Sequence, residues 1–167
     1  MLQPFLTSGQ QQTREGFSLV ELLVVVAVVS VLASIGLPLA ELAHKRTQEE
    51  ELRQSLRQIR SALDAYKQAT DLGHITKQVD ASSYPPNLDV LVTGVPDAQS
   101  PKGNKLFFLR RIPRDPFAPD EIDDAAQTWG LRSYESTAAD PKPGKDVYDV
   151  YSKSGGVGMS GIPYRRW

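Results

Sequence analysis

The 167-residue chain contains no cysteine and only two histidines. The absence of cysteine excludes disulfide bonds and thiolate metal sites. His44 and His74 lie far apart in sequence without ligand spacing, so we expect both at the surface. The 19 basic and 20 acidic residues leave a net charge of −1, which indicates neither a polyanion nor a polycation partner. No phosphate-binding loop or catalytic constellation is present. We therefore predict a chain that is not an enzyme, uses no cofactor and binds no nucleic acid.

Charge is also nearly absent from residues 17–42, where Glu21 and Glu41 are the only ionisable side chains. Residues 17–39 would span about 35 Å as a helix, enough to cross a hydrocarbon core of roughly 30 Å. The apolar core of a secretory signal peptide is shorter, about 7–15 residues. The segment therefore favours a membrane anchor, and an ordinary signal anchor is the main alternative to a more specialised one.

Glu21 is unusual in such a helix. A carboxylate at the centre of a spanning segment costs roughly 2.5–3.5 kcal/mol. Cleavage after Gly16 would give Phe17 a free α-amino group, four residues before Glu21 and on the same helix face. That amine would neutralise Glu21 in the same chain or in a neighbouring copy. In a polymer, the pair would also set the register between subunits.

Residues 16–24, Gly-Phe-Ser-Leu-Val-Glu-Leu-Leu-Val, resemble the class III signal of type IV pilins and type II secretion pseudopilins. The resemblance implies that a prepilin peptidase cuts between Gly16 and Phe17 and methylates the new amino group of Phe17. It also implies a role for Glu21 in assembly. Pro38 falls where this family commonly has a helix-bending proline. An interior proline removes a backbone donor and distorts the helix, although Pro38 could also mark an ordinary helix end at the membrane surface.

The leader, residues 1–16, carries Arg14 as its only basic residue, whereas Lys45 and Arg46 follow the apolar run. The positive-inside rule alone therefore leaves the orientation ambiguous or reversed. The cleavage motif implies a cytoplasmic leader, a single crossing of the bacterial inner membrane by residues 17–42, and a periplasmic C-terminal part.

Residues 43–73 show an amphipathic helical pattern that continues from the apolar segment. Large apolar side chains recur at spacings of three and four residues, which is one stripe of a helix: Leu52, Leu56, Ile59, Leu63 and Tyr66. Gly73 is a suitable C-cap residue. The repeat is short for a coiled coil, so we expect the stripe to pack against residues 74–167.

Residues 74–167 predict a small domain for which the helix supplies one wall. A short helix is expected after Pro85 and Pro86. Strands are expected within residues 106–109, 128–134 and 146–152. In the last of these, alternation places Val147 on the opposite side from Val150. A long helix followed by antiparallel strands gives an α+β fold, which the resemblance narrows to a pilin fold.

The second half resembles the major pseudopilins, the G subunits of type II secretion, in residues 84–91, 109–117 and 147–152. Major pseudopilins often bind calcium in an acidic loop after the last strand. Here residues 153–161 contain no carboxylate, whereas calcium takes six to eight oxygen ligands. A separate acidic cluster, which includes Asp120, Asp123 and Asp124, is a weak candidate for calcium binding, and a solvated loop is the favoured interpretation.

These features together predict a structural subunit of a type II secretion pseudopilus that helps to export folded proteins. The resemblance implies self-assembly, assembly with other pseudopilins, processing by the peptidase, and contact with an inner-membrane platform and its ATPase. A type IV pilus subunit for adhesion, motility or DNA uptake is the nearest alternative. A signal-anchored periplasmic binding module is a more distant one.

Overall fold

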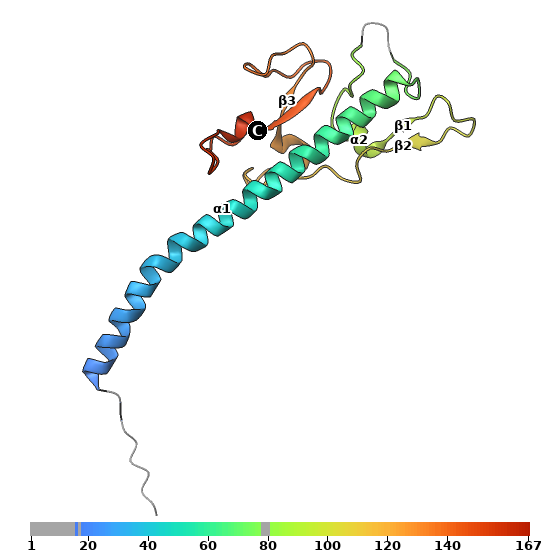
Figure 1. Ribbon diagram of the computed structural model, residues 1–167. Helices are drawn as coiled ribbons and strands as arrows, with labels where there is room; N and C mark the ends of the chain where they lie inside the picture. Colours follow the sequence, from blue (N-terminus) through green and yellow to red (C-terminus); the bar gives the residue numbers. More distant parts are fainter. Residues whose placement is uncertain (1–15, 17, 78–80) are drawn as a thin grey trace, which may run out of the picture. The chain divides into compact units, whose positions relative to one another are not determined.

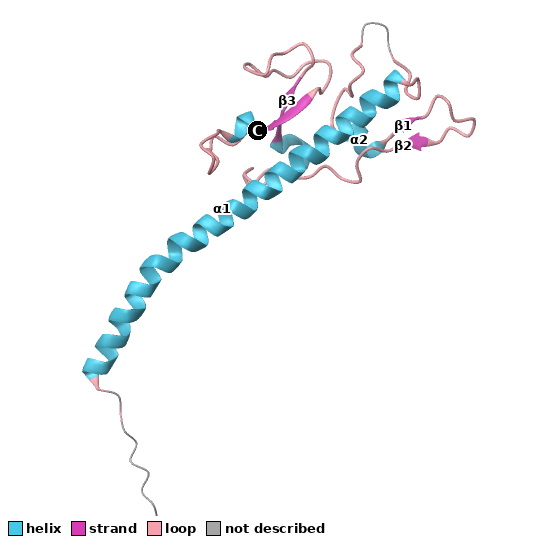
Figure 2. Ribbon diagram, in the orientation of Figure 1, coloured by secondary structure: helices cyan, strands magenta, loops and turns pink. Residues whose placement is uncertain are grey.

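The structure is a computed structural model that describes residue 16 and residues 18–77 and 81–167, with residues 35–38 described by their backbone alone (Figure 1). Its elements are α1 (Leu19–Asp71), α2 (Asp89–Thr93), β1 (Val95–Pro96), β2 (Lys105–Leu106), the 3₁₀ helix η1 (Ala125–Thr128), β3 (Trp129–Arg132), β4 (Asp149–Ser152) and the 3₁₀ helix η2 (Tyr164–Arg166). One long helix precedes short antiparallel strands joined by loops (Figure 2). The predicted α+β pilin fold is confirmed.

The chain divides into two units, Met1–Leu42 and Ala43–Trp167, and α1 contributes residues to both. In the first unit, the large apolar side chains of α1 are exposed. The second unit contains every strand of the described residues and the buried hydrophobic core. The apolar side chains of α1 are therefore exposed in the first unit and form part of the buried core in the second.

The C-terminal end of α1 is closed by a Schellman motif. Gly73 has a φ of 79°, a left-handed conformation that glycine adopts without steric cost. The N–H of Gly73 donates to the carbonyl of Thr70 at 3.0 Å, and the N–H of His74 donates to the carbonyl of Ala69 at 2.9 Å. These bonds satisfy two carbonyls at the end of the helix, so the predicted cap at Gly73 is confirmed.

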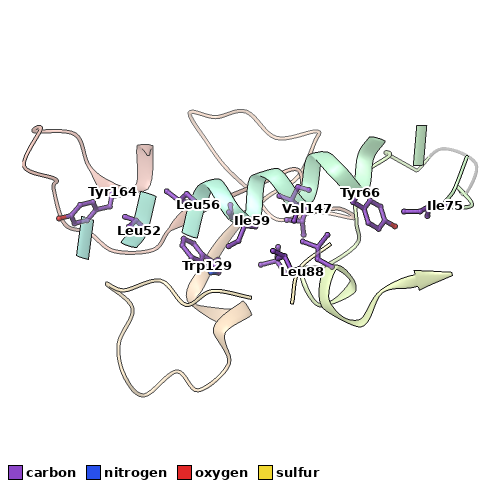
Figure 3. Packing of buried hydrophobic residues seen from close by; sticks show 14 residues of the cluster. Leu52, Leu56, Ile59, Tyr66, Ile75, Leu88, Trp129, Val147 and Tyr164 are labelled. Atoms are coloured by element: carbon purple, nitrogen blue, oxygen red, sulfur yellow. The ribbon is translucent and has the colours of Figure 1, made fainter. Parts of the chain in front are cut away.

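The core of the second unit follows the apolar stripe of α1. All five residues of the predicted stripe are buried, with exposures of 0–7%. Figure 3 shows Tyr164 beside Leu52 at one end of the stripe, and Ile75 beyond Tyr66 at the other end. Between these ends lie Trp129, Leu88 and Val147. The stripe is therefore covered by its own chain, as the docked-domain interpretation predicted, rather than left free for a coiled coil.

Two separate two-stranded antiparallel sheets form, rather than one sheet. In the first, β1 pairs with β2, and Val95 lies opposite Leu106. In the second, β3 pairs with β4, and Leu131 lies opposite Val150. The strand predicted within residues 128–134 is confirmed as β3.

The strand predicted over residues 106–109 is wrong beyond Leu106. The N–H groups of Phe108 and Leu109 both donate to the carbonyl of Leu91, at 3.0 and 2.9 Å. These hydrogen bonds tie the apolar run to α2 as a loop. Leu106, Phe108 and Leu109 pack on the core, whereas Phe107 is exposed.

The prediction for residues 146–152 is correct only from Asp149 onward. The N–H of Val147 donates to the carbonyl of Pro85 at 2.8 Å, outside the β3–β4 ladder. Val147 and Val150 are consequently both buried, although strict alternation placed them on opposite sides. The predicted short helix after Pro86 is present as α2, beginning at Asp89.

Candidate assembly site and the network that holds the soluble unit

The predicted processing site lies at the start of α1. Gly16 is exposed and non-helical, and α1 begins at Leu19 with the N–H of Leu22 donating to the carbonyl of Ser18 at 3.1 Å. Phe17 lies outside the described residues, as do residues 1–15 of the predicted leader. Among the described residues, a Cβ added to Gly16 meets no atom within 4 Å. The folded chain therefore has space for alanine at Gly16.

Glu21 occupies the first turn of α1 and is exposed. A negative charge there interacts favourably with the N-terminal end of the helix macrodipole. The first turn also keeps Glu21 on the face that residue 17 would occupy if the helix extended back by two residues. The pairing of Glu21 with the Phe17 amine remains a prediction.

The α1 segment that follows is apolar on every side. Among the described residues, α1 is the one helix long and apolar enough to cross a membrane. Its large apolar side chains in the first unit are 51–73% exposed: Leu19, Val20, Leu22, Leu23, Val24, Val25, Val26, Val28, Val29, Val31, Leu32, Leu39 and Leu42. A helix that is hydrophobic all round requires an apolar environment supplied by lipid or by other helices.

Two serine hydroxyls of this segment are satisfied locally. The hydroxyl of Ser30 donates to the carbonyl of Val26, and that of Ser34 donates to the carbonyl of Ser30, both at 2.7 Å. Such bonds to the preceding turn suit serine in lipid, where water is absent. The backbone of α1 stays helical through Pro38. A bend at Pro38 remains a prediction.

In the second unit, Asp149 joins α1 to both strands of the second sheet. Its Oδ1 accepts a hydrogen bond from Arg60 Nε of α1 at 2.8 Å, and its Oδ2 accepts one from Arg132 of β3 at 3.0 Å. The Arg60 guanidinium also donates to the carbonyls of Val150 and Trp167, at 3.2 and 2.7 Å. One carboxylate and two arginines thus hold the helix, the sheet and the C-terminal tail together.

Glu49 is a buried acid at the beginning of the apolar stripe, with an exposure of 4%. Its Oε1 accepts hydrogen bonds from the N–H of Met159 at 2.8 Å and from the hydroxyl of Tyr164 at 3.0 Å. Burial of the phenol, together with its hydrogen bond to the Glu49 carboxylate, raises the pKa of Tyr164 to about 12. Because Tyr164 is buried, the C-terminal tail is docked on the second unit.

Sequence reasoning missed the role of Glu49. Glu49 is the first of three consecutive glutamates, and such an acidic run is typical of a solvated helix face. In the structure Glu50 and Glu51 are exposed, whereas Glu49 is buried. The available signal was its position three residues before Leu52, on the line of the apolar stripe. Its partners lie more than 100 residues away in sequence, so local patterns could not identify them.

The turn formed by residues 114–117, of sequence Arg-Asp-Pro-Phe, supports the same tail. Arg114 donates to the carbonyls of Ile122 and Pro119, and Asp115 Oδ1 accepts the N–H of Phe117 at 2.9 Å. The Phe117 ring stacks on that of Tyr164 with centroids 4.2 Å apart. The turn is therefore part of the packing around the C-terminal segment.

The acidic cluster gives no support to a metal centre. Asp120, Asp123 and Asp124 are exposed. Asp124 caps η1, since its Oδ1 accepts the N–H of Ala126 at 2.9 Å and its Oδ2 accepts from the Gln127 amide at 3.1 Å. Within the described part of the chain, no group of three or more His, Cys, Asp or Glu side chains is placed to hold a metal ion. These contacts fit a solvated, capped loop.

The two histidines differ from each other. His44 is exposed, as expected, whereas His74 is partly buried with its Nδ1 2.9 Å from Asp97 Oδ1. The hydrogen bond from His74, followed by that from the Gln99 N–H, lowers the pKa of Asp97. This pair fastens the residues after α1 to the loop after β1.

Comparison with known proteins places these features in a family. The model of the prokaryotic N-terminal methylation motif matches residues 12–37. A type II secretion system core protein G from Klebsiella pneumoniae is 30% identical over 116 residues, covering 65% of this chain and 73% of the relative. The chain belongs to the type II secretion system core protein G family.

Two further members of the core protein G family match over greater lengths. The protein from Pseudomonas aeruginosa is 28% identical over 145 residues, which is 84% of this chain and 94% of the relative. The protein from Klebsiella michiganensis is 25% identical over 141 residues, covering 82% and 92%. No solved structure matches the chain significantly. With its methylation motif and apolar α1 segment, the chain is a membrane-anchored pseudopilin.

Proposed function

We propose that this pseudopilin is a structural subunit of a type II secretion pseudopilus. In this proposal, a prepilin peptidase cleaves it between Gly16 and Phe17 and methylates the Phe17 amine. The mature chain then polymerises through its N-terminal helix and helps to export folded proteins. The observation that carries the proposal is an α1 segment with exposed apolar side chains on every face and one acid, Glu21, in its first turn.

The hydrophobic effect gives little driving force for assembly within the membrane, because lipid tails are as apolar as the side chains of a neighbouring helix. Glu21 supplies a force that lipid does not. An unpaired carboxylate is costly inside a bilayer, and its attraction to the Phe17 amine of a neighbouring subunit strengthens as the local dielectric constant falls. A neighbouring subunit that is aligned so that its Phe17 amine meets Glu21 is therefore favoured over lipid as the contact of this helix.

The proposal places the chain in the bacterial inner membrane with a single crossing and the second unit in the periplasm. Its partners are other copies, other pseudopilins, the prepilin peptidase, and the inner-membrane assembly platform with its ATPase. The shared description of the three relatives supports secretion over a type IV pilus. No enzymatic role or cofactor is part of the proposal.

Replacement of Glu21 tests the proposal. We expect Glu21→Ala and Glu21→Gln to be processed normally but to form few or no filaments, because the N-terminal amine of the neighbour loses its partner. Glu41→Ala is the matched control, an exposed acid farther along α1, and should assemble as the wild type does.

Filaments are counted by electron microscopy of cells that overexpress each variant, and processing is followed by the mass of the purified subunit. Wild-type numbers of filaments from both Glu21 variants would overturn the register role of this acid. An equal defect in Glu41→Ala would show that loss of any acid in α1 is sufficient.

A further inference from the structure

Residues 153–163, here called the terminal loop, connect β4 to η2 and contain no carboxylate. Calcium requires six to eight oxygen ligands, several of them usually anionic. The acids near the loop offer little to an ion. Both oxygens of Asp149 accept hydrogen bonds from arginines, and Oε1 of Glu49 accepts the N–H of Met159 and the hydroxyl of Tyr164. The residues present therefore do not fit the calcium site that the family resemblance implies.

The terminal loop is instead closed by hydrogen bonds of its own. The N–H of Gly158 donates to the carbonyl of Ile162, and the N–H of Gly161 donates to the carbonyl of Gly158, both at 2.9 Å. Gly161 adopts a φ of 79°, which favours glycine at this turn. The N–H of Tyr164 closes the base of the loop on the carbonyl of Gly156 at 3.1 Å.

Two oppositely charged side chains on successive turns of α1 hold this loop from outside. The buried Glu49 accepts the N–H of Met159 and the Tyr164 hydroxyl. One turn earlier, the Lys45 ammonium donates to the carbonyl of Val157 at 2.9 Å. Hydrogen bonds to charged groups are shorter and stronger than neutral ones. The helix thus satisfies one N–H and one carbonyl of the loop, and a metal ion could bind only the carbonyl.

We propose that Glu49, assisted by Lys45, holds the terminal loop in the place of a metal ion, so that the loop is closed with or without calcium. The inference concerns the folding of the second unit and does not rest on the proposed function. It has a consequence for the surface, because Val157, Met159 and Ile162 of this loop are 46–49% exposed. Their arrangement would be constant across calcium concentrations.

The test compares calcium with a chelator in the full chain, solubilised in detergent. Thermal unfolding and hydrogen exchange of residues 153–164 are measured in calcium chloride and in EGTA. We expect the same melting temperature and the same exchange rates in both. A melting temperature several degrees higher in calcium, with slower exchange in the loop, would overturn the proposal.

Substitution of Glu49 tests the second half of the proposal. We expect Glu49→Ala to raise loop exchange by about tenfold or more in either buffer, because Met159 and Tyr164 lose a charged acceptor. Glu49→Gln keeps a carbonyl oxygen and the side-chain shape, so it should fold and show a smaller increase. Glu50→Ala, in which the neighbouring exposed acid is removed, should match the wild type.

Wild-type exchange in both Glu49 variants would show that the loop does not depend on this acid. If Glu49→Ala does not fold, the Gln variant and the calcium comparison still decide the matter. Wild-type loop exchange in Glu49→Gln would then contradict the proposal.

Discussion

Removal of the Asp149 carboxylate should destabilise the second unit by more than the loss of an ordinary surface ion pair. Asp149→Ala leaves the guanidinium groups of Arg60 and Arg132 without their carboxylate partner. The side chain of Asp149 is 24% exposed, and those of Arg60 and Arg132 are 37% and 17% exposed. The two ion pairs of Asp149 are therefore partly shielded from solvent. Their contribution to the free energy of unfolding should lie between that of exposed and that of buried ion pairs.

The magnitude follows from these limits. Fully exposed ion pairs contribute about 0.2–1 kcal/mol, whereas a hydrogen bond to a charged group contributes about 1.5–3 kcal/mol. For two half-shielded pairs, we expect Asp149→Ala to lower the free energy of unfolding by about 2–3 kcal/mol. At about 2–4 °C per kcal/mol for a chain of this size, the melting temperature should fall by about 4–12 °C. Asp149→Asn keeps one acceptor oxygen and should lose about half as much.

Urea unfolding of the detergent-solubilised chain, followed by tryptophan fluorescence, measures the effect. Trp129 is buried in the core, so its emission reports on the second unit. Asp140→Ala is the control, because Asp140 pairs with Lys142 at 2.8 Å but both side chains are about two-thirds exposed. The reasoning is refuted if Asp149→Ala and Asp140→Ala lower stability by the same small amount.

Two further predictions concern single side chains. The unfolded Tyr164 phenol should ionise near its ordinary pKa of 10, whereas the folded one keeps its proton to about 12. This difference in pKa stabilises the folded chain fully below pH 10, and the stabilisation is lost between pH 10 and about 12. Tyr164→Phe should therefore flatten the dependence of the free energy of unfolding on pH in this range. An unchanged slope would contradict the pKa argument. Gly73→Ala places a side chain at φ 79° and should lower the free energy of unfolding by about 1–2 kcal/mol. Gly155→Ala, which meets no described atom within 4 Å, should be near neutral, and equal losses in the two variants would argue against strain at Gly73.

The regular parts of this fold could be predicted because they depend on local periodicity. The stripe from Leu52 to Tyr66 follows the 3.6-residue repeat of a helix, and all its members are buried. Gly73 follows the stripe at the position where a helix ends on a left-handed residue. The apolar α1 segment needs only length and composition to be identified.

The failures occur where distant contacts decide the structure. Phe108 and Leu109 read as a strand, but both their N–H groups bond to Leu91. Val147 is buried by the segment at Pro85 rather than by strand alternation. Glu49 resembles a solvated acid until the terminal loop covers it. In each case the partner lies too far along the chain for any short pattern to indicate it.

Mass spectrometry of the subunit purified from membranes tests the central claim most directly. If the chain is a processed pseudopilin, the intact mass and the N-terminal peptide should show a chain that begins at Phe17 and carries one added methyl group. Gly16→Ala should retain the leader, and the space around Gly16 excludes a steric cause among the described residues. A wild-type subunit that still begins at Met1, or that is cut anywhere other than before Phe17, would contradict the account.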